Sequence, residues 1–290
     1  MQPRTTADKV FDGICIFVLV LMSVIIIFPI WNVVVNSFSS AAAVASGKGI
    51  FWPSEFSIEN YRAVFRDTSI WMAFLISVLK TVIGVVCHVF FCAMVAYGMS
   101  KTYLKGRKLY TTMGVITMFF SGGMIPTYLL IKDLHLLNTF WVYIIPALFS
   151  YYDMVVLMNF FRQVPDSLEE AALLDGAGTW RVFLRIVLPI SKPSLATIAL
   201  FHGVSQWNDF MTAKLYVTDK SLYPLQMKLY EIIVQQQTSQ MANPTGATIA
   251  TTSKGIQLAT IVVTTLPIVI IYPLLQKYFM SGMMLGAVKE

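Results

Sequence analysis

Two glutamates, Glu169 and Glu170, stand directly before two alanines in a polar segment between apolar runs. Carboxylates pair with basic groups, and alanines let another backbone approach closely. Ser167 and Glu170 have the spacing of a capping box, and Gly176 can end a helix in the left-handed conformation. The spacing therefore predicts one short helix whose acids and small face, Ala171 and Ala172, fit a groove on another protein.

A second short helix is expected over residues 180–187, capped by Thr179 and ended by Pro189. An alternative is that the whole segment is an amphipathic helix lying on a bilayer. That alternative accounts for Trp180 and Phe183, but it does not account for the acidic stretch 169–176, because interfacial helices prefer Lys and Arg.

The composition indicates a membrane protein. Of 290 residues, 57% are hydrophobic and 12% are charged, whereas soluble domains are about 45–50% apolar and about 25% charged. The three cysteines, Cys15, Cys87 and Cys92, all fall inside apolar runs without metal-ligand spacing, so they are expected to be packing thiols. The net charge of +6 fits basic cytoplasmic loops better than nucleic-acid binding.

The apolar runs predict an all-α, polytopic fold with six transmembrane helices. Each run is about 20 residues long, enough to cross about 30 Å of hydrocarbon. A short interfacial helix at 70–76 is expected to lead into the second span. The predicted spans are residues 14–35, 77–99, 110–131, 140–161, 193–212 and 257–279.

Basic residues orient the spans. With both termini inside, the inner segments 1–13, 100–109, 162–192 and 276–290 hold 12 Lys and Arg residues. The longer outer segments 36–69, 131–139 and 212–256 hold 8. The positive-inside rule therefore predicts the N-in, C-in orientation.

Three divisions of the chain follow. Residues 1–69 hold the N-terminal tail, the first span and the first outer loop, and residues 70–280 form the transmembrane core with the inner loop 162–192. Residues 281–290 are a cytoplasmic tail. A cleaved signal peptide is the alternative for the first span, but its apolar run is longer than a signal core.

The inner loop resembles the EAA loop of the permeases of ABC importers. That motif reads Glu-Ala-Ala, three residues, Gly, nine residues, Ile-x-Leu-Pro. Every spacing is met here. The matching residues and the flanking acids, which the resemblance assigns to contact with an ATPase, are Glu169, Glu170, Ala171, Ala172, Asp175, Gly176, Ile186, Leu188 and Pro189.

Further segments are similar to carbohydrate-uptake permeases of the maltose-importer kind. They are Trp207-Asn208-Asp209-Phe210 and Tyr223-Pro224-Leu225-Gln226. Three more segments are similar to a subgroup of these permeases that takes up oligosaccharides and polysaccharide fragments. They are the stretch from Gly122 to Tyr128, Leu137-Asn138-Thr139 and the ending Ser281-Gly282-Met283-Met284.

The resemblance implies the type I ABC importer permease fold in the plasma membrane and a non-catalytic subunit. It implies a second permease subunit in a heterodimer, two ATPase subunits that bind ATP and Mg, and an extracytoplasmic sugar-binding protein that is often a lipoprotein. It also implies alternating access, driven through the loop helix. No cofactor or metal is expected in this chain, and the sequence has no phosphate-binding Gly-x-x-x-x-Gly-Lys motif.

Polar and aromatic residues within spans are candidates for a substrate pathway. Asn208 and Asp209 can contact sugar hydroxyls or the binding protein, or can simply end a helix. His88 is expected to be a buried hydrogen-bonded histidine rather than a ligand, and Lys80 is expected to extend outward to the interface. The candidate pathway residues are Trp207, Asn208, Asp209, His88, Gln206 and Tyr128.

Two other functions stay open at this point. An ABC permease for a non-sugar solute would share the inner loop, but the segment 207–210 argues against it. A stand-alone secondary transporter or membrane enzyme is the other. Ion-coupled carriers tend to carry acids inside their spans, whereas the acids here lie almost entirely in loops.

Overall fold

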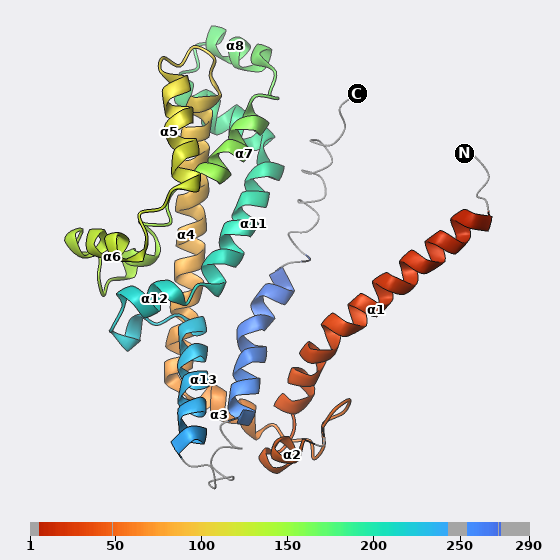
Figure 1. The fold of residues 1–290 in the computed structure, drawn as a ribbon. Coiled ribbons are helices and arrows are strands. Elements are labelled where there is room, and N and C mark those ends of the chain that lie inside the picture. The colour runs from red at the N-terminus through yellow and green to blue at the C-terminus, as the bar shows by residue number, and fades with distance from the viewer. Residues whose placement is uncertain (1–5, 48, 243–253, 272, 274–290) are drawn as a thin grey trace. The chain divides into compact units, whose positions relative to one another are not determined.

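The computed structural model describes residues 6–47, 49–242, 254–271 and 273. The described elements are helices, and the β structure among them is one isolated antiparallel bridge between Ser39 and Phe56. Figure 1 shows these helices as a ribbon coloured from the N-terminus to the C-terminus. By its internal contacts, the chain divides into two compact units. The first joins Met1–Thr68 with Leu229–Leu266, and the second joins Ser69–Lys228 with the described residues from Pro267 onward.

The first unit begins with the long helix α1 (Thr6–Ser37), followed by α2 (Ala41–Ser46) and α3 (Glu59–Arg66). The apolar run of α1 is long enough to span a bilayer, and none of its most apolar stretch is buried within the described chain. The buried Asn60 amide closes the following loop by donating to the carbonyls of Ser37 and Ser39, each at 3.0 Å.

The second unit holds the remaining short and long helices. Its elements are α4 (Thr68–Ser100), α5 (Arg107–Phe119), α6 (Met124–Asp133), a 3₁₀ turn (Phe140–Tyr143), α7 (Tyr151–Phe161), α8 (Asp166–Leu174), α9 (Thr179–Val182), a π-helical turn (Phe183–Val187), α10 (Leu188–Ile190), α11 (Lys192–Asn208), α12 (Met211–Tyr216), a second 3₁₀ turn (Lys220–Leu222) and the start of α13 (Leu225–Ala242).

Helix α4 is the longest uninterrupted helix among the described residues of this unit. It runs without a break over 33 residues, so the prediction of a separate lead-in helix at 70–76 is wrong. Its small residues Cys92, Ala93 and Ala96 are fully buried and pack in one core with Leu157 of α7 and Val187 of the π-helical turn. Small side chains allow this close helix packing without a driving force from water.

The predicted third span is broken in two. α5 ends at Phe119 and α6 begins at Met124, with a bend of 115° between them. Gly123 supplies the break, because its φ of +87° lies in the region that favours glycine. α6 carries the exposed apolar side chains Ile125 and Leu130.

The predicted fourth span is helical only in its second half. Pro146 has no N–H to donate, and the chain passes through turns until Ser150 caps α7 by accepting from the Asp153 N–H at 3.3 Å. The 11 residues of α7 are too few to cross a bilayer alone.

The fifth predicted span, residues 193–212, is interrupted near its end, because α11 ends at Asn208 and α12 begins at Met211. The sixth predicted span begins within the described helix Lys254–Ile271. Three described helices are long and apolar enough to cross a bilayer, or five if each bent pair is one span. The count of six spans stays a prediction, and so do the division boundaries after residues 69 and 280. The tail 281–290, which contains the segment 281–284, lies outside the described residues.

Candidate functional site

The predicted loop helix is α8, and its ends are set by local chemistry. It begins at Asp166, after Pro165. Its first turn carries Asp166 and Glu169, whose negative charges are stabilised by the positive end of the helix dipole. The predicted capping box is wrong, because the residue before the helix is Pro165 and no side chain caps it. The predicted left-handed stop is confirmed, since Gly176 has a φ of +78°.

Two hydrogen bonds complete the C-terminal stop of α8. The Gly176 N–H donates to Leu173 O at 3.0 Å, and the Ala177 N–H donates to Ala172 O at 2.9 Å. These are the two bonds of a Schellman motif. Asp175 is exposed at the cap position. The loop after the helix is therefore fixed in direction rather than free.

The side chains of α8 divide between two faces. Glu170, Ala171 and Leu173 are exposed, and Leu174 is 89% exposed. Ala172 instead packs against the core. The two alanines of the motif therefore lie on different faces, so the predicted small face holds only Ala171.

Glu169 lies on the inner face of α8 and contacts its own chain. Its carboxylate pairs with the Lys101 ammonium and accepts a hydrogen bond of 3.1 Å from the Tyr97 hydroxyl. Lys101 also lies 4.5 Å from the centre of the Tyr97 ring. Lys101 and Tyr97 were not among the predicted site residues, because nothing local in the sequence pairs residues about 70 positions apart.

The segment that follows α8 anchors it to the helical core of the second unit. Thr179 is the first residue of α9 rather than its cap, and the helical course changes to a π-helical turn at Phe183. Phe183 and Val187 are buried, and Ile186 and Leu188 pack against the same core. The predicted end at Pro189 is wrong, because the break falls at Ser191, where the two helical stretches meet at 79°.

Polar residues of α4 bind the interrupted segments that face it. Lys80 has no exposed surface and donates to the Asp209 carbonyl at 2.8 Å, with the Asp209 carboxylate at 3.5 Å. The prediction that Lys80 extends to the interface is therefore wrong. Ser77 accepts the Leu225 N–H at 2.7 Å. The two side chains thus form hydrogen bonds with a backbone carbonyl and a backbone N–H that have no helical partner where the helices are interrupted. In an apolar setting such groups would otherwise be costly.

His88 is the buried hydrogen-bonded histidine that the sequence predicts. Its Nδ1 lies 2.8 Å from the Ala147 carbonyl, and its Nε2 lies 3.0 Å from the Asp153 carboxylate. The ring of His202 stacks on it, with 3.7 Å between the ring centres. Buried Gln206 donates to the Tyr143 carbonyl at 3.1 Å.

His88, Asp153 and His202 bring three metal-binding groups within 4.8 Å of one another. The two imidazole planes are within 7° of parallel, so their in-plane lone pairs do not converge on one point. Both nitrogens of His88 already face oxygen atoms. The cluster is arranged as a hydrogen-bond network that fixes the start of α7 against α4.

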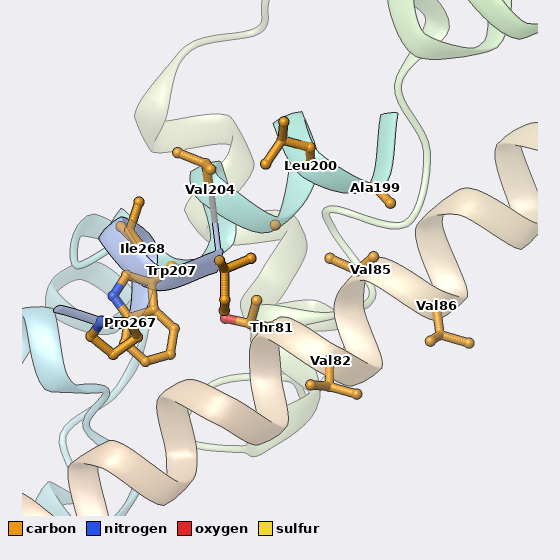
Figure 2. A pocket seen from close by; sticks show the side chains of 12 residues that line it. Thr81, Val82, Val85, Val86, Ala199, Leu200, Val204, Trp207, Pro267 and Ile268 are labelled. Carbon is orange, nitrogen blue, oxygen red and sulfur yellow. The ribbon is translucent and has the colours of Figure 1, made fainter. Parts of the chain in front are cut away.

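The other predicted pathway residues lie in three different settings. Asn208 is exposed and accepts from the Gln226 amide at 3.4 Å. Tyr128 is 38% exposed and stacks on Tyr216. Trp207 is buried and borders an apolar cavity of about 270 Å³ between α4, α11 and the segment from Pro267 (Figure 2). The structure therefore does not bring all six candidates into one site.

One signal for this network was present in the sequence. Ser77, Lys80, Gly84, His88 and Cys92 recur every three or four residues and share one face of α4. Their partners, among them Asp153, could not be identified that way, because they are set by tertiary packing.

Comparison with known proteins agrees with this architecture. Residues 1–285 match the family described as binding-protein-dependent transport system inner membrane component. The chain is 39% identical over 286 residues to protein LplC of Bacillus subtilis (strain 168), covering 99% of this chain and 97% of that one. It is also 39% identical over 287 residues to the polygalacturonan/rhamnogalacturonan transport system permease protein YtcP of the same organism, covering 97% and 99%.

A solved structure shares the fold. It is the crystal structure of a bacterial ABC transporter involved in the import of the acidic polysaccharide alginate, with a TM-score of 0.87, 29% identity, and coverage of 96% of this chain and all of that one. The chain therefore belongs to the binding-protein-dependent transport system inner membrane component family, as a multi-pass ABC importer permease of the inner membrane.

Proposed function

We propose that the chain is one transmembrane half of an ATP-driven importer that moves a carbohydrate by alternating access. The observation that carries the proposal is the exposed face of α8, where Leu174 is 89% exposed beside Glu170. Leu168 and Leu173 of the same helix are exposed as well. A helix that presents several apolar side chains beside an acid is suited to a groove on another protein. A partner ATPase would supply that groove.

The proposed topology is six spans with both termini in the cytoplasm. The higher density of Lys and Arg in the segments 1–13, 100–109, 162–192 and 276–290 supports it. In this orientation α8 faces the cytoplasm, where ATP is available.

The proposed assembly is a heterodimer of two permeases with two ATPase subunits and an extracytoplasmic binding protein. ATP and Mg would bind the ATPases. The apolar, unburied surface of α1 supports a second membrane subunit or lipid around it. The family description itself implies a binding protein.

The proposed cargo is an oligosaccharide. Its support is the names of the relatives: a polygalacturonan/rhamnogalacturonan permease, a diacetylchitobiose permease of Streptomyces coelicolor that is 30% identical, and the alginate importer. Exposed groups that can meet sugar hydroxyls and sugar faces are Asn208 and Tyr128. Lys80 and His88 are committed to internal contacts, so they are assigned to holding the pathway rather than lining it.

Uptake into proteoliposomes tests this function. The purified complex, with its binding protein outside and ATP inside, is given labelled oligosaccharides, neutral and acidic. Import that requires both ATP and the binding protein is expected. Import driven by an ion gradient without ATP would contradict the proposal and restore the secondary-transporter alternative.

A further inference from the structure

Glu169 and Glu170 are neighbours in sequence but face different surroundings. The Glu170 side chain is exposed, whereas the Glu169 side chain is 13% exposed and lies against Lys101, which is 17% exposed. A carboxylate held in this way has little surface left for a partner protein. The two acids therefore have separate roles, and the role of Glu169 lies within the chain.

Three groups hold the Glu169 carboxylate in place. Lys101 supplies the charge, the Tyr97 hydroxyl donates at 3.1 Å, and the Tyr97 ring lies 4.5 Å beneath the Lys101 ammonium. Largely buried, hydrogen-bonded ion pairs are screened less by water than exposed ones, so their charges interact more strongly. The link thus joins α8 to the end of α4.

Helix α4 carries two further polar links, one of them an ion pair. Lys80 pairs with Asp209 at the end of α11, and His88 pairs with Asp153 in the first turn of α7. Lys80 and Lys101 are 21 positions apart, or about 32 Å along a helix. α4 therefore connects the docking helix at one end with the interrupted, polar part of the unit toward the other.

We propose that Glu169 and Lys101 form a positioning pair that transmits ATP-driven movement of α8 to α4, which carries it to Asp153 and Asp209. The inference rests on the proposed function, because it presumes that α8 receives the ATPase. Movement reaches the pathway through α4 as well as through the covalent route into α11. A long unbroken helix suits this task, because it moves as a rigid body.

A double-mutant cycle in the reconstituted complex tests the pair. The variants are Glu169→Gln, Lys101→Met and the two together, with Lys105→Met as a control for loss of an exposed lysine in the same loop. Each is assayed for ATPase subunits retained on purification, for ATP hydrolysis, and for oligosaccharide imported per ATP hydrolysed. The ratio separates coupling from simple loss of folded protein.

The expected result is retained ATPase subunits and continued hydrolysis, with import per ATP lowered at least about fivefold in either single variant. The double variant should be no worse than the more affected single one, and Lys105→Met should match the wild type. Loss of ATPase subunits in Glu169→Gln but not in Lys101→Met would overturn the inference, because Glu169 would then bind the ATPase. A wild-type ratio in both singles would overturn it too. Either result would leave the proposed function standing.

Discussion

The Lys80 ammonium donates a hydrogen bond of 2.8 Å to the backbone carbonyl of Asp209, and the Lys80 side chain has no exposed surface. Asp209 directly follows the last residue of α11, and its carboxylate also accepts the Thr212 N–H at 3.1 Å. One side chain of α4 thus holds the point where a helix stops and the chain turns. Removing a buried partner is costly, because the remaining group is left unpaired.

The first prediction concerns this pair. Lys80→Met should destabilise the protein by on the order of 2 kcal/mol, since the Asp209 groups lose their donor but are partly reached by water. Asp209→Asn should cost a similar amount, and the double variant should cost no more than the worse single one. Melting temperature in detergent measures this, with the exposed Lys132→Met as the control. Additive losses would mean that the two residues act independently.

The second prediction concerns the contact between α5 and α7. A Cβ added at Gly114 would lie 1.8 Å from the Tyr151 ring, which is buried and donates from its hydroxyl to Thr111 O at 3.1 Å. Gly114→Ala should therefore destabilise the protein by about 1–3 kcal/mol through overpacking.

The matched control for Gly114 is Gly98, another helical glycine with no atom within 4 Å of an added Cβ. Gly98→Ala should leave the melting temperature unchanged or raise it, because alanine favours helix. Equal effects of the two substitutions would show that the α5–α7 contact is not as close as described.

The third prediction concerns the end of α8. Gly176 has a φ of +78°, where alanine costs about 1–2 kcal/mol, so Gly176→Ala should loosen the Schellman stop. Gly178 lies two residues on, with a φ of −74° and open space around it, so Gly178→Ala should have a much smaller effect. Hydrogen exchange of the Ala177 amide reads out the stop directly. Unchanged protection in Gly176→Ala would contradict the prediction.

Sequence reasoning located α8 well and the broken spans poorly. Gly176 acts through its own backbone, and the acids and alanines before it favour a helix, so a local pattern was enough to place each end of the helix within about two residues. Apolar composition, in contrast, is the same in a straight span and a bent one. The helix breaks at Gly123 and Pro146 were therefore not predicted, although glycine and proline are both residues that can interrupt a helix.

The polar network could be predicted only in part. Burial of His88 followed from its place in an apolar run, but its partner Asp153 lies 65 residues away across a turn. For Lys80 the sequence suggested the interface, because a lysine near a helix end usually reaches water. The turn at Asp209 instead presents a carbonyl and a carboxylate inside the unit, and only tertiary structure brings them there.

The docking role of α8 is the central claim, and one measurement tests it most directly. Leu174→Asp places a charge on the most exposed apolar side chain of the helix, and Gln163→Asp places the same charge on an exposed residue just before it. Both variants are purified with the tagged ATPase subunit, and binding-protein-stimulated ATP hydrolysis is measured in proteoliposomes. The account predicts that Leu174→Asp loses the ATPase subunit and the stimulation, while Gln163→Asp keeps both. Wild-type retention and stimulation in Leu174→Asp would contradict it.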